Sequence, residues 1–178
     1  MRKRLFFLAA LLATAAQAQI PLFDHDPRGR VPEEFEYAQE RPVEFPALPA
    51  ADKLLPFDPG RPTSMRFYVD GDSVSVGEDG VVRYTLVVEG DAGTRNIMYE
   101  GVRCKTAERK TYGFGQPDGS WSRARDPQWE QYAYDVPRRT LYVNFLCPLK
   151  GPIRTAEEGV QALREGAHPL VRQFQSTN

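Results

Sequence analysis

The chain has 178 residues, 41% of them hydrophobic and 26% charged, and its 23 basic residues nearly balance 24 acidic ones. Length and composition indicate one globular domain of ordinary size. Without an excess of basic residues, nucleic acid and an anionic membrane are excluded as the main partner, since both require concentrated positive charge.

The first 18 residues have the pattern of a cleavable signal peptide. A cationic segment at 2–4 precedes an apolar run at 5–16, and the small residues Ala16 and Ala18 fit cleavage before Gln19. The apolar run is shorter than the roughly 20 residues that span a bilayer. We therefore expect a soluble periplasmic protein that starts at Gln19, has no membrane anchor, and carries 20 basic residues against 24 acidic ones, a net charge of −4. Display on the cell surface and secretion are the less favoured predictions for its location.

Residues 19–63 contain nine prolines, together with acidic residues and isolated aromatic ones. Prolines at this spacing prevent a long helix and remove donors from a sheet ladder. We predict an extended arm, with Phe35, Phe45 and Phe57 available to pin it to the domain surface. A tether is favoured over a partner-binding strip, because proline- and charge-rich segments commonly act as linkers.

Residues 64–165 change to the alternating pattern of short strands, separated by turns rich in glycine and aspartate. The predicted strands cover residues 65–70, 73–76, 81–89, 95–104 and 109–115. Connections of a few residues favour an antiparallel meander over parallel crossover units. We therefore predict an α+β domain with a single antiparallel sheet of about five strands and one or two short helices packed on it.

Helical signals follow the strands. Thr155–Glu158 resembles a capping box, and the short helix that it starts can end at Gly166. Residues 138–147 are ambiguous, because Leu141 and Phe145 fit both helical and strand spacing. The tail, residues 166–178, is predicted to be weakly ordered.

Cys104 and Cys147 are the two cysteines of the chain. In an exported protein they are expected to pair. Closing a loop of about 43 residues stabilises a fold by roughly 4 kcal/mol in the chain-entropy model. A nucleophilic or redox role is disfavoured, because the two cysteines are far apart in the sequence and neither has a histidine nearby. We predict one structural disulfide.

No catalytic, metal-binding or cofactor-binding residue is assigned. The chain has two histidines, and the adjacent side chains of Asp24, His25 and Asp26 cannot converge on one metal ion without help from elsewhere. His168, before Pro169, is expected at the surface. The serines lack a nucleophile-elbow context, and the sequence has no phosphate-binding glycine loop. An enzyme is therefore the disfavoured interpretation.

Aromatic and basic residues alternate between residues 109 and 134, which makes this region the candidate binding surface. Tryptophan, tyrosine and arginine dominate binding hot spots. The candidate contact residues are Tyr112, Trp121, Arg123, Arg125, Trp129 and Tyr132. The alternative, which we favour for the two tryptophans, is that they cover one end of the core.

Several short motifs follow one another in a specific order between residues 64 and 165. They are Phe67–Gly77, Asp79–Val88, Tyr99–Cys104, Gly119–Trp121, Phe145–Pro148 and Ala156–Gly159. In this order they resemble the cryptic neisserial protein-like (CNP1-like) family. The resemblance implies an exported bacterial protein whose biochemical role is uncharacterised, and it brings no catalytic residues.

A more distant similarity rests on the Tyr-x-Asp-x-x-Ser strand that starts at Tyr68, on Cys104 at the end of a middle strand, on Trp121 and on Cys147. This order is similar to the surface adhesin protein E family. The similarity implies an antiparallel sheet with a helix packed on it, a cysteine bridge and binding of host proteins. The lipid-anchored start of that adhesin is absent here.

The leading functional hypothesis is an exported, non-catalytic binding or envelope-assembly module. It would contact an unknown envelope protein or cell-wall component through residues 121–134 and the arm. One alternative is a small periplasmic ligand-binding protein or enzyme with scattered acidic residues such as Asp70, Asp72 and Glu100. The other alternative is an adhesin-like protein at the cell surface.

Overall fold

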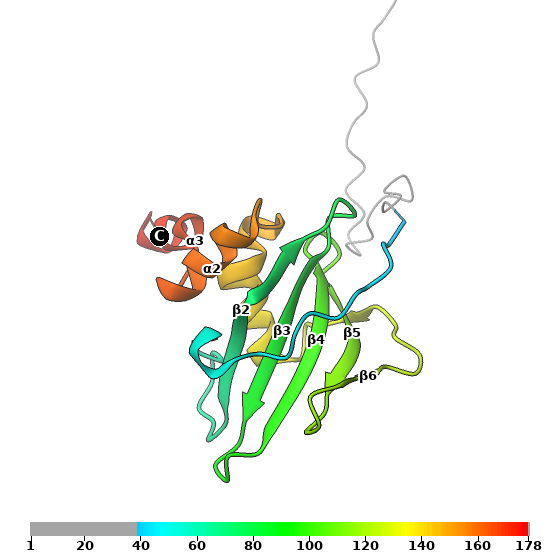
Figure 1. The fold of residues 1–178 in the computed structure, drawn as a ribbon. Helices are drawn as coiled ribbons and strands as arrows, with labels where there is room; N and C mark the ends of the chain where they lie inside the picture. Colours follow the sequence, from blue (N-terminus) through cyan, green and yellow to red (C-terminus); the bar gives the residue numbers. More distant parts are fainter. Residues whose placement is uncertain (1–38, 178) are drawn as a thin grey trace, which may run out of the picture. The chain divides into compact units, whose positions relative to one another are not determined.

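The computed structural model describes residues 39–177. The predicted signal peptide with its cleavage site at Ala18 and Gln19, the segment at 24–26 and Phe35 lie outside these residues. Within the described range, seven strands form one antiparallel sheet (Figure 1). The strands are β1 (Leu54–Pro56), β2 (Arg66–Val76), β3 (Val82–Glu89), β4 (Arg95–Arg103), β5 (Glu108–Gly115), β6 (Trp121–Arg123) and β7 (Glu130–Gln131).

The strand order confirms the predicted meander and the α+β class. Strands β1 to β6 lie side by side in chain order, and β7 pairs with the start of β5, whose end pairs with β6. The predicted strands 65–70 and 73–76 are one strand, β2, whose register against β3 shifts between Asp70 and Ser75. The additional strands β1, β6 and β7 have only two or three residues each, too few for an alternating pattern to stand out.

Helical segments occupy mainly the C-terminal part (Figure 1). They are the 3-10 turn η1 (Ala51–Lys53), α1 (Val136–Leu141), the π-helix η2 (Tyr142–Leu146), the 3-10 turn η3 (Pro148–Lys150), α2 (Ala156–Arg164) and α3 (Pro169–Thr177). Asp135 begins α1, because its carboxylate accepts a hydrogen bond from the backbone of Arg138 at 3.2 Å. The ambiguous residues 138–147 are therefore helical up to Leu146.

The tail differs from the prediction at two points. Residues 169–177 form helix α3, with Val171 buried. His168 is 3% exposed, so its predicted surface position is wrong. Its Nε2 lies 2.9 Å from Glu158 and its Nδ1 accepts a hydrogen bond from the backbone N–H of Leu170 at 3.2 Å, and these bonds offset the cost of burying a polar ring.

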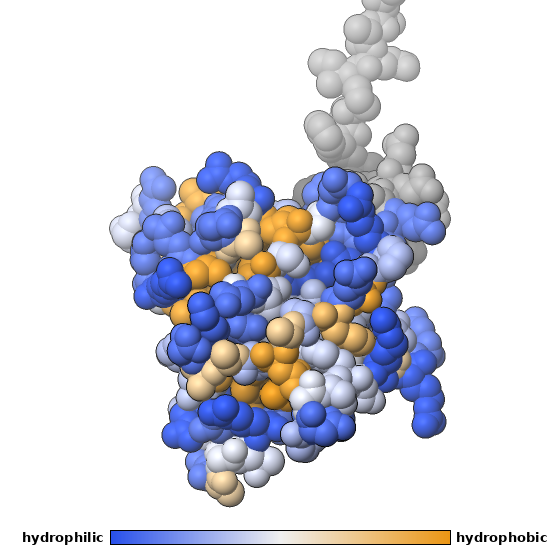
Figure 2. Space-filling view, viewed as in Figure 1, coloured by the Kyte–Doolittle hydropathy of each residue, from blue (hydrophilic) through white to orange (hydrophobic). Residues whose placement is uncertain are grey.

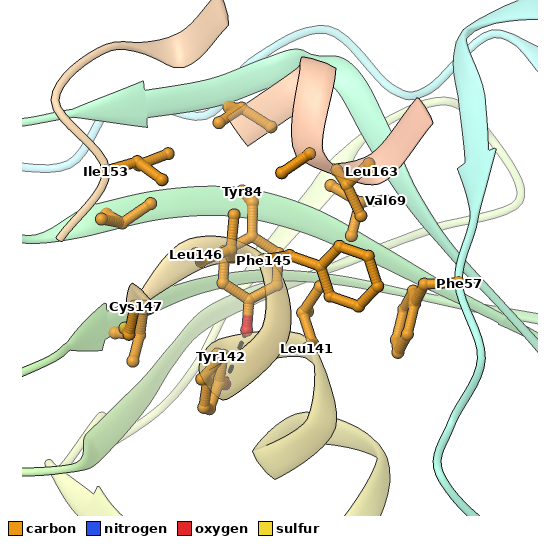
Figure 3. Close-up of a cluster of buried hydrophobic side chains, with 14 of the residues drawn as sticks. Phe57, Val69, Tyr84, Leu141, Tyr142, Phe145, Leu146, Cys147, Ile153 and Leu163 are labelled. Carbon is orange, nitrogen blue, oxygen red and sulfur yellow. Dashed lines mark hydrogen bonds between the residues drawn. The ribbon is translucent and has the colours of Figure 1, made fainter. Parts of the chain in front are cut away.

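The main core lies between one face of the sheet and the helices (Figure 3). Tyr84 and Val69 point from the strands toward Phe145 of η2 and Leu163 of α2, and Leu86 belongs to the same core. Opposed residues of neighbouring strands share a face of the sheet, so this helix-side face continues along each strand with period two. The opposite face is covered by the chain segment before β1.

The predicted disulfide between Cys104 and Cys147 is confirmed, with the Cα atoms 5.3 Å apart. It joins the end of β4 to the end of η2 and so fastens the helical layer to the sheet.

The disulfide generates the first prediction. Cys104→Ala combined with Cys147→Ala is expected to lower the free energy of unfolding by about 2–4 kcal/mol, because the unfolded chain gains the entropy that the bridge removes. Urea denaturation followed by circular dichroism measures this, and reduced wild-type protein is the control. A loss below about 1 kcal/mol in both samples would show that the bridge is not a main stabiliser.

Candidate functional site

The predicted aromatic surface binds the protein's own chain. We define residues 40–48 as the strap. Trp121 stacks on Phe45 of the strap with the ring centroids 5.2 Å apart, and its indole N–H donates to the carbonyl of Pro46 at 2.8 Å. Arg123 lies 4.8 Å from the Phe45 ring and donates to the carbonyl of Val43 at 3.4 Å. Gly113 leaves the space for this ring, because a Cβ there would lie 2.7 Å from it.

Trp129 holds the start of the strap. Its indole N–H donates to the Glu40 carboxylate at 3.2 Å, and Lys110 donates to the same oxygen at 2.8 Å. Burial alone would raise the pKa of Glu40, but the hydrogen bonds, that of Lys110 first, keep this pKa below its usual value. The guanidinium of Arg103 lies 4.1 Å above the Trp129 ring.

Of the other predicted contact residues, Tyr112 lies beneath the strap, beside Glu40 and with its ring centroid 5.8 Å from that of Tyr99, whereas Tyr132 and Arg125 do not share this surface. Tyr112 and Tyr132 are buried, and Tyr132 packs in the core with its ring 4.5 Å from that of Tyr142. Burial raises the pKa of both Tyr112 and Tyr132. Arg125 is exposed. Trp121, Arg123 and Trp129 are therefore brought together, and the strap occupies the surface that they form.

The strap crosses the strands on the face turned toward the viewer in Figure 1. Figure 2 shows apolar residues in the middle of that view, with hydrophilic residues around them.

The acidic residues of the enzyme alternative lie apart. Asp70 is opposite Thr85, on the strap side of the sheet, whereas Glu100 is opposite Tyr84 on the helix side. Asp72 pairs with Lys53 at 3.5 Å. A groove next to Asp72 is lined by neither Asp70 nor Glu100. The described residues thus place these three carboxylates in separate environments.

Glu100 is the centre of a buried polar network. Its side chain is fully buried and accepts hydrogen bonds from Tyr84 at 2.8 Å and from Arg138 at 2.7 Å. The hydroxyls of Tyr84 and Tyr142 are 2.6 Å apart (Figure 3). Burial raises the pKa of both tyrosines well above its usual value. Burial would lower the pKa of Arg138, but the charge of Glu100 holds it above its usual range.

Arg138 also reaches a groove, which we call the arginine groove. The groove has a volume of about 820 Å³ and lies on the helix-side face of the sheet, beside the start of α1. Its apolar floor comes from four adjacent strands, through Phe67, Val88, Met98 and Phe114. The remaining lining residues include Arg61, Met65, Arg95, Asn96, Ile97, Arg109, Gln116, Gln131, Tyr134 and Asp135.

The charge of the arginine groove is positive. Four arginines line it, and among its described lining residues Asp135 is the one acid, already bound to Arg138 at 2.7 Å. Arg109 pairs with the exposed Glu130 at 3.1 Å, and the Nε of Arg95 donates to Glu89 at 2.8 Å. Guanidinium groups keep further donors when one of them is engaged, so the groove can bind carboxylate or phosphate groups.

Basic, amide and apolar side chains make up most of the described lining of the arginine groove. Its described lining contains no histidine, cysteine or serine that could act as base or nucleophile. Residues 39–177 also contain no group of three histidine, cysteine or acidic side chains able to hold a metal ion. Sequence reasoning missed this site because its residues come from segments as distant as Arg61 and Arg138.

The buried network generates the second prediction. Glu100→Gln keeps the shape but removes the buried counter-charge of Arg138 and leaves it only the partly exposed Asp135, so the free energy of unfolding is expected to fall by about 3 kcal/mol. Glu130→Gln, which removes the partner of Arg109 at the surface, is the matched control and should cost less than about 1 kcal/mol. Equal losses in urea denaturation would mean that the network is not a special stabiliser.

Comparison with known proteins gives one match. The model of the CNP1-like family matches residues 33–164, which include the strap as well as the sheet and helix α2. No curated protein matches the chain. No solved structure matches it either. Among the described residues, the helices are all too short or too polar to cross a membrane.

Proposed function

The chain belongs to the CNP1-like family, and we propose that it is an exported, non-catalytic binding module whose binding surface is the arginine groove. The observation that carries the proposal is the combination of an apolar floor with four arginines in a groove of about 820 Å³. A concave site with an apolar floor and a few placed polar groups is the usual form of a binding site.

Two features support export. The charged, apolar and small-residue segments of residues 1–18 follow the order of a signal peptide. The disulfide between Cys104 and Cys147 is of the kind that forms and persists in oxidising compartments such as the periplasm.

Exposure favours the arginine groove over the aromatic surface as the contact site. The strap already engages Trp121 and Trp129. In contrast, Met65 and Phe114 at the groove are 42% and 45% exposed, and Tyr134 is 97% exposed. Clustered apolar side chains that remain in water mark interaction sites more often than isolated ones do.

The export part is tested by the mass of the protein recovered from cells. The denatured, non-reduced mass is expected to match a chain that begins at Gln19 and lacks two hydrogens, and fractionation should place it with periplasmic markers. A chain that still begins at Met1, or one found with cytoplasmic markers, would refute export.

The binding part is tested by position-specific cross-linking. A photoreactive amino acid in place of Phe114 is expected to give a discrete covalent product in living cells. The same amino acid in place of Val143, which is 46% exposed on η2 and does not line the groove, is the control and should not give that product. Identical patterns at the two positions, or no product at either, would rule out the groove as the binding surface.

A further inference from the structure

We infer that the arginine groove binds an extended, acidic and apolar segment of a partner protein. This inference rests on the proposed function and adds the chemical class of the occupant. Three properties of the groove carry it: the spacing of its arginines, the polar side chains between them, and its openness to solvent.

Two of the lining arginines stand at different levels along the sheet: Arg109 belongs to the helix-side face, and Arg95, whose backbone position faces the strap side, lines the groove near the start of β4. On β4, Arg95 lies opposite Glu89, and seven residues further along, Val102 lies opposite Arg109 of β5. Seven residues of strand span about 23 Å. The floor residues Met98 and Phe114 are opposite each other between these two levels. A segment of about seven residues in extended conformation can therefore place acidic groups at both ends and apolar side chains in the middle.

Amide side chains line the same groove. The amide nitrogens of Gln116 and Gln131 each donate to a carbonyl of the chain, that of Phe114 at 3.2 Å and that of Thr106 at 3.0 Å. Each keeps a second N–H and its amide oxygen, and these groups, with the amide of Asn96, match the peptide groups of an extended chain. A single acyl chain has no groups that would use these amides. Met65 and Met98 add flexible side chains, which adapt to apolar residues of varied shape.

Openness favours a protein segment over a small amphiphile. Sites for small ligands bury most of the ligand surface. Here Phe114 and Met65 stay nearly half exposed and Tyr134 almost fully exposed. A partner protein covers such side chains with its own surface on both sides of the bound segment, whereas a small molecule leaves them in water.

Charge complementarity supplies the preference for acidic residues. Arg61 lies in the loop before β2 and has no ion pair with any described residue. Arg95 engages one of its nitrogens with Glu89, which leaves its two terminal nitrogens for a ligand. A carboxylate that accepts two parallel hydrogen bonds from such a guanidinium is held in a fixed orientation as well as bound.

The test measures binding of a fluorescein-labelled peptide, Asp-Glu-Leu-Phe-Leu-Glu-Asp, to the full mature protein by fluorescence polarisation. Two matched peptides replace the four acids by lysine or the three apolar residues by serine. The acidic apolar peptide is expected to bind at least about tenfold tighter than either, and its affinity should fall as salt rises.

Variants of the protein locate the site. Arg61→Glu and Arg95→Glu are each expected to weaken binding of the acidic apolar peptide by about fivefold or more. Arg139→Glu is the matched control, because Arg139 lies on α1 and is exposed but does not line the groove. It should change the affinity by less than about twofold. Circular dichroism of each variant confirms that it is folded.

Several outcomes would overturn the inference. Equal binding of the acidic and lysine peptides, or unchanged binding in both groove variants, would refute the acidic class. Tighter binding of dodecyl phosphate than of the peptide, lost in the same variants, would show that the occupant is an anionic lipid. In each case a Phe114 cross-link that is absent at Val143 would leave the proposed function standing, and loss of that cross-link would remove both.

Discussion

The ion pair between Glu100 and Arg138 is the interaction on which the rest of the arrangement depends. A carboxylate without solvent contact in the middle of a strand costs several kcal/mol unless a cation and hydrogen bonds compensate it. Arg138 supplies both, and its position fixes the start of α1 over β4. Because η2 continues α1, the same pair brings Cys147 to Cys104 and Tyr142 to Tyr84. Because the start of α1 also forms one wall of the arginine groove, the buried ion pair determines the position of that wall.

The sequence predicted the parts of this protein that depend on local pattern. The strands near 81–89, 95–104 and 109–115 alternate clearly, so their existence and their antiparallel order followed from residues that are neighbours in the chain. The π-helix η2 did not follow, because Leu141 and Phe145 satisfy two periods at once. His168 was misplaced because its burial depends on Glu158, a tertiary contact with no local signal.

The candidate site was predictable only in its residue types. Trp121, Arg123 and Trp129 do form one surface, but its occupant, the strap, depends on the space at Gly113 that only the folded sheet defines. The arginine groove is assembled from connecting segments, five strands and the start of α1. The two faces of the sheet consequently differ. The strap covers one face, whereas the part of the helix-side face that the helices do not cover exposes apolar and cationic side chains to water.

The strap has a consequence for the order in which the protein folds. Its hydrogen bonds to Trp121 and Trp129 join residues 75 and 89 positions apart in the sequence. During synthesis the strap emerges before its receptor, and it can dock only after β5 and β6 have paired. Contacts of such long sequence separation form late and slowly. Until then the apolar middle of that sheet face is open to water, and this is the interval in which a newly synthesised chain is most exposed to aggregation and to chaperones.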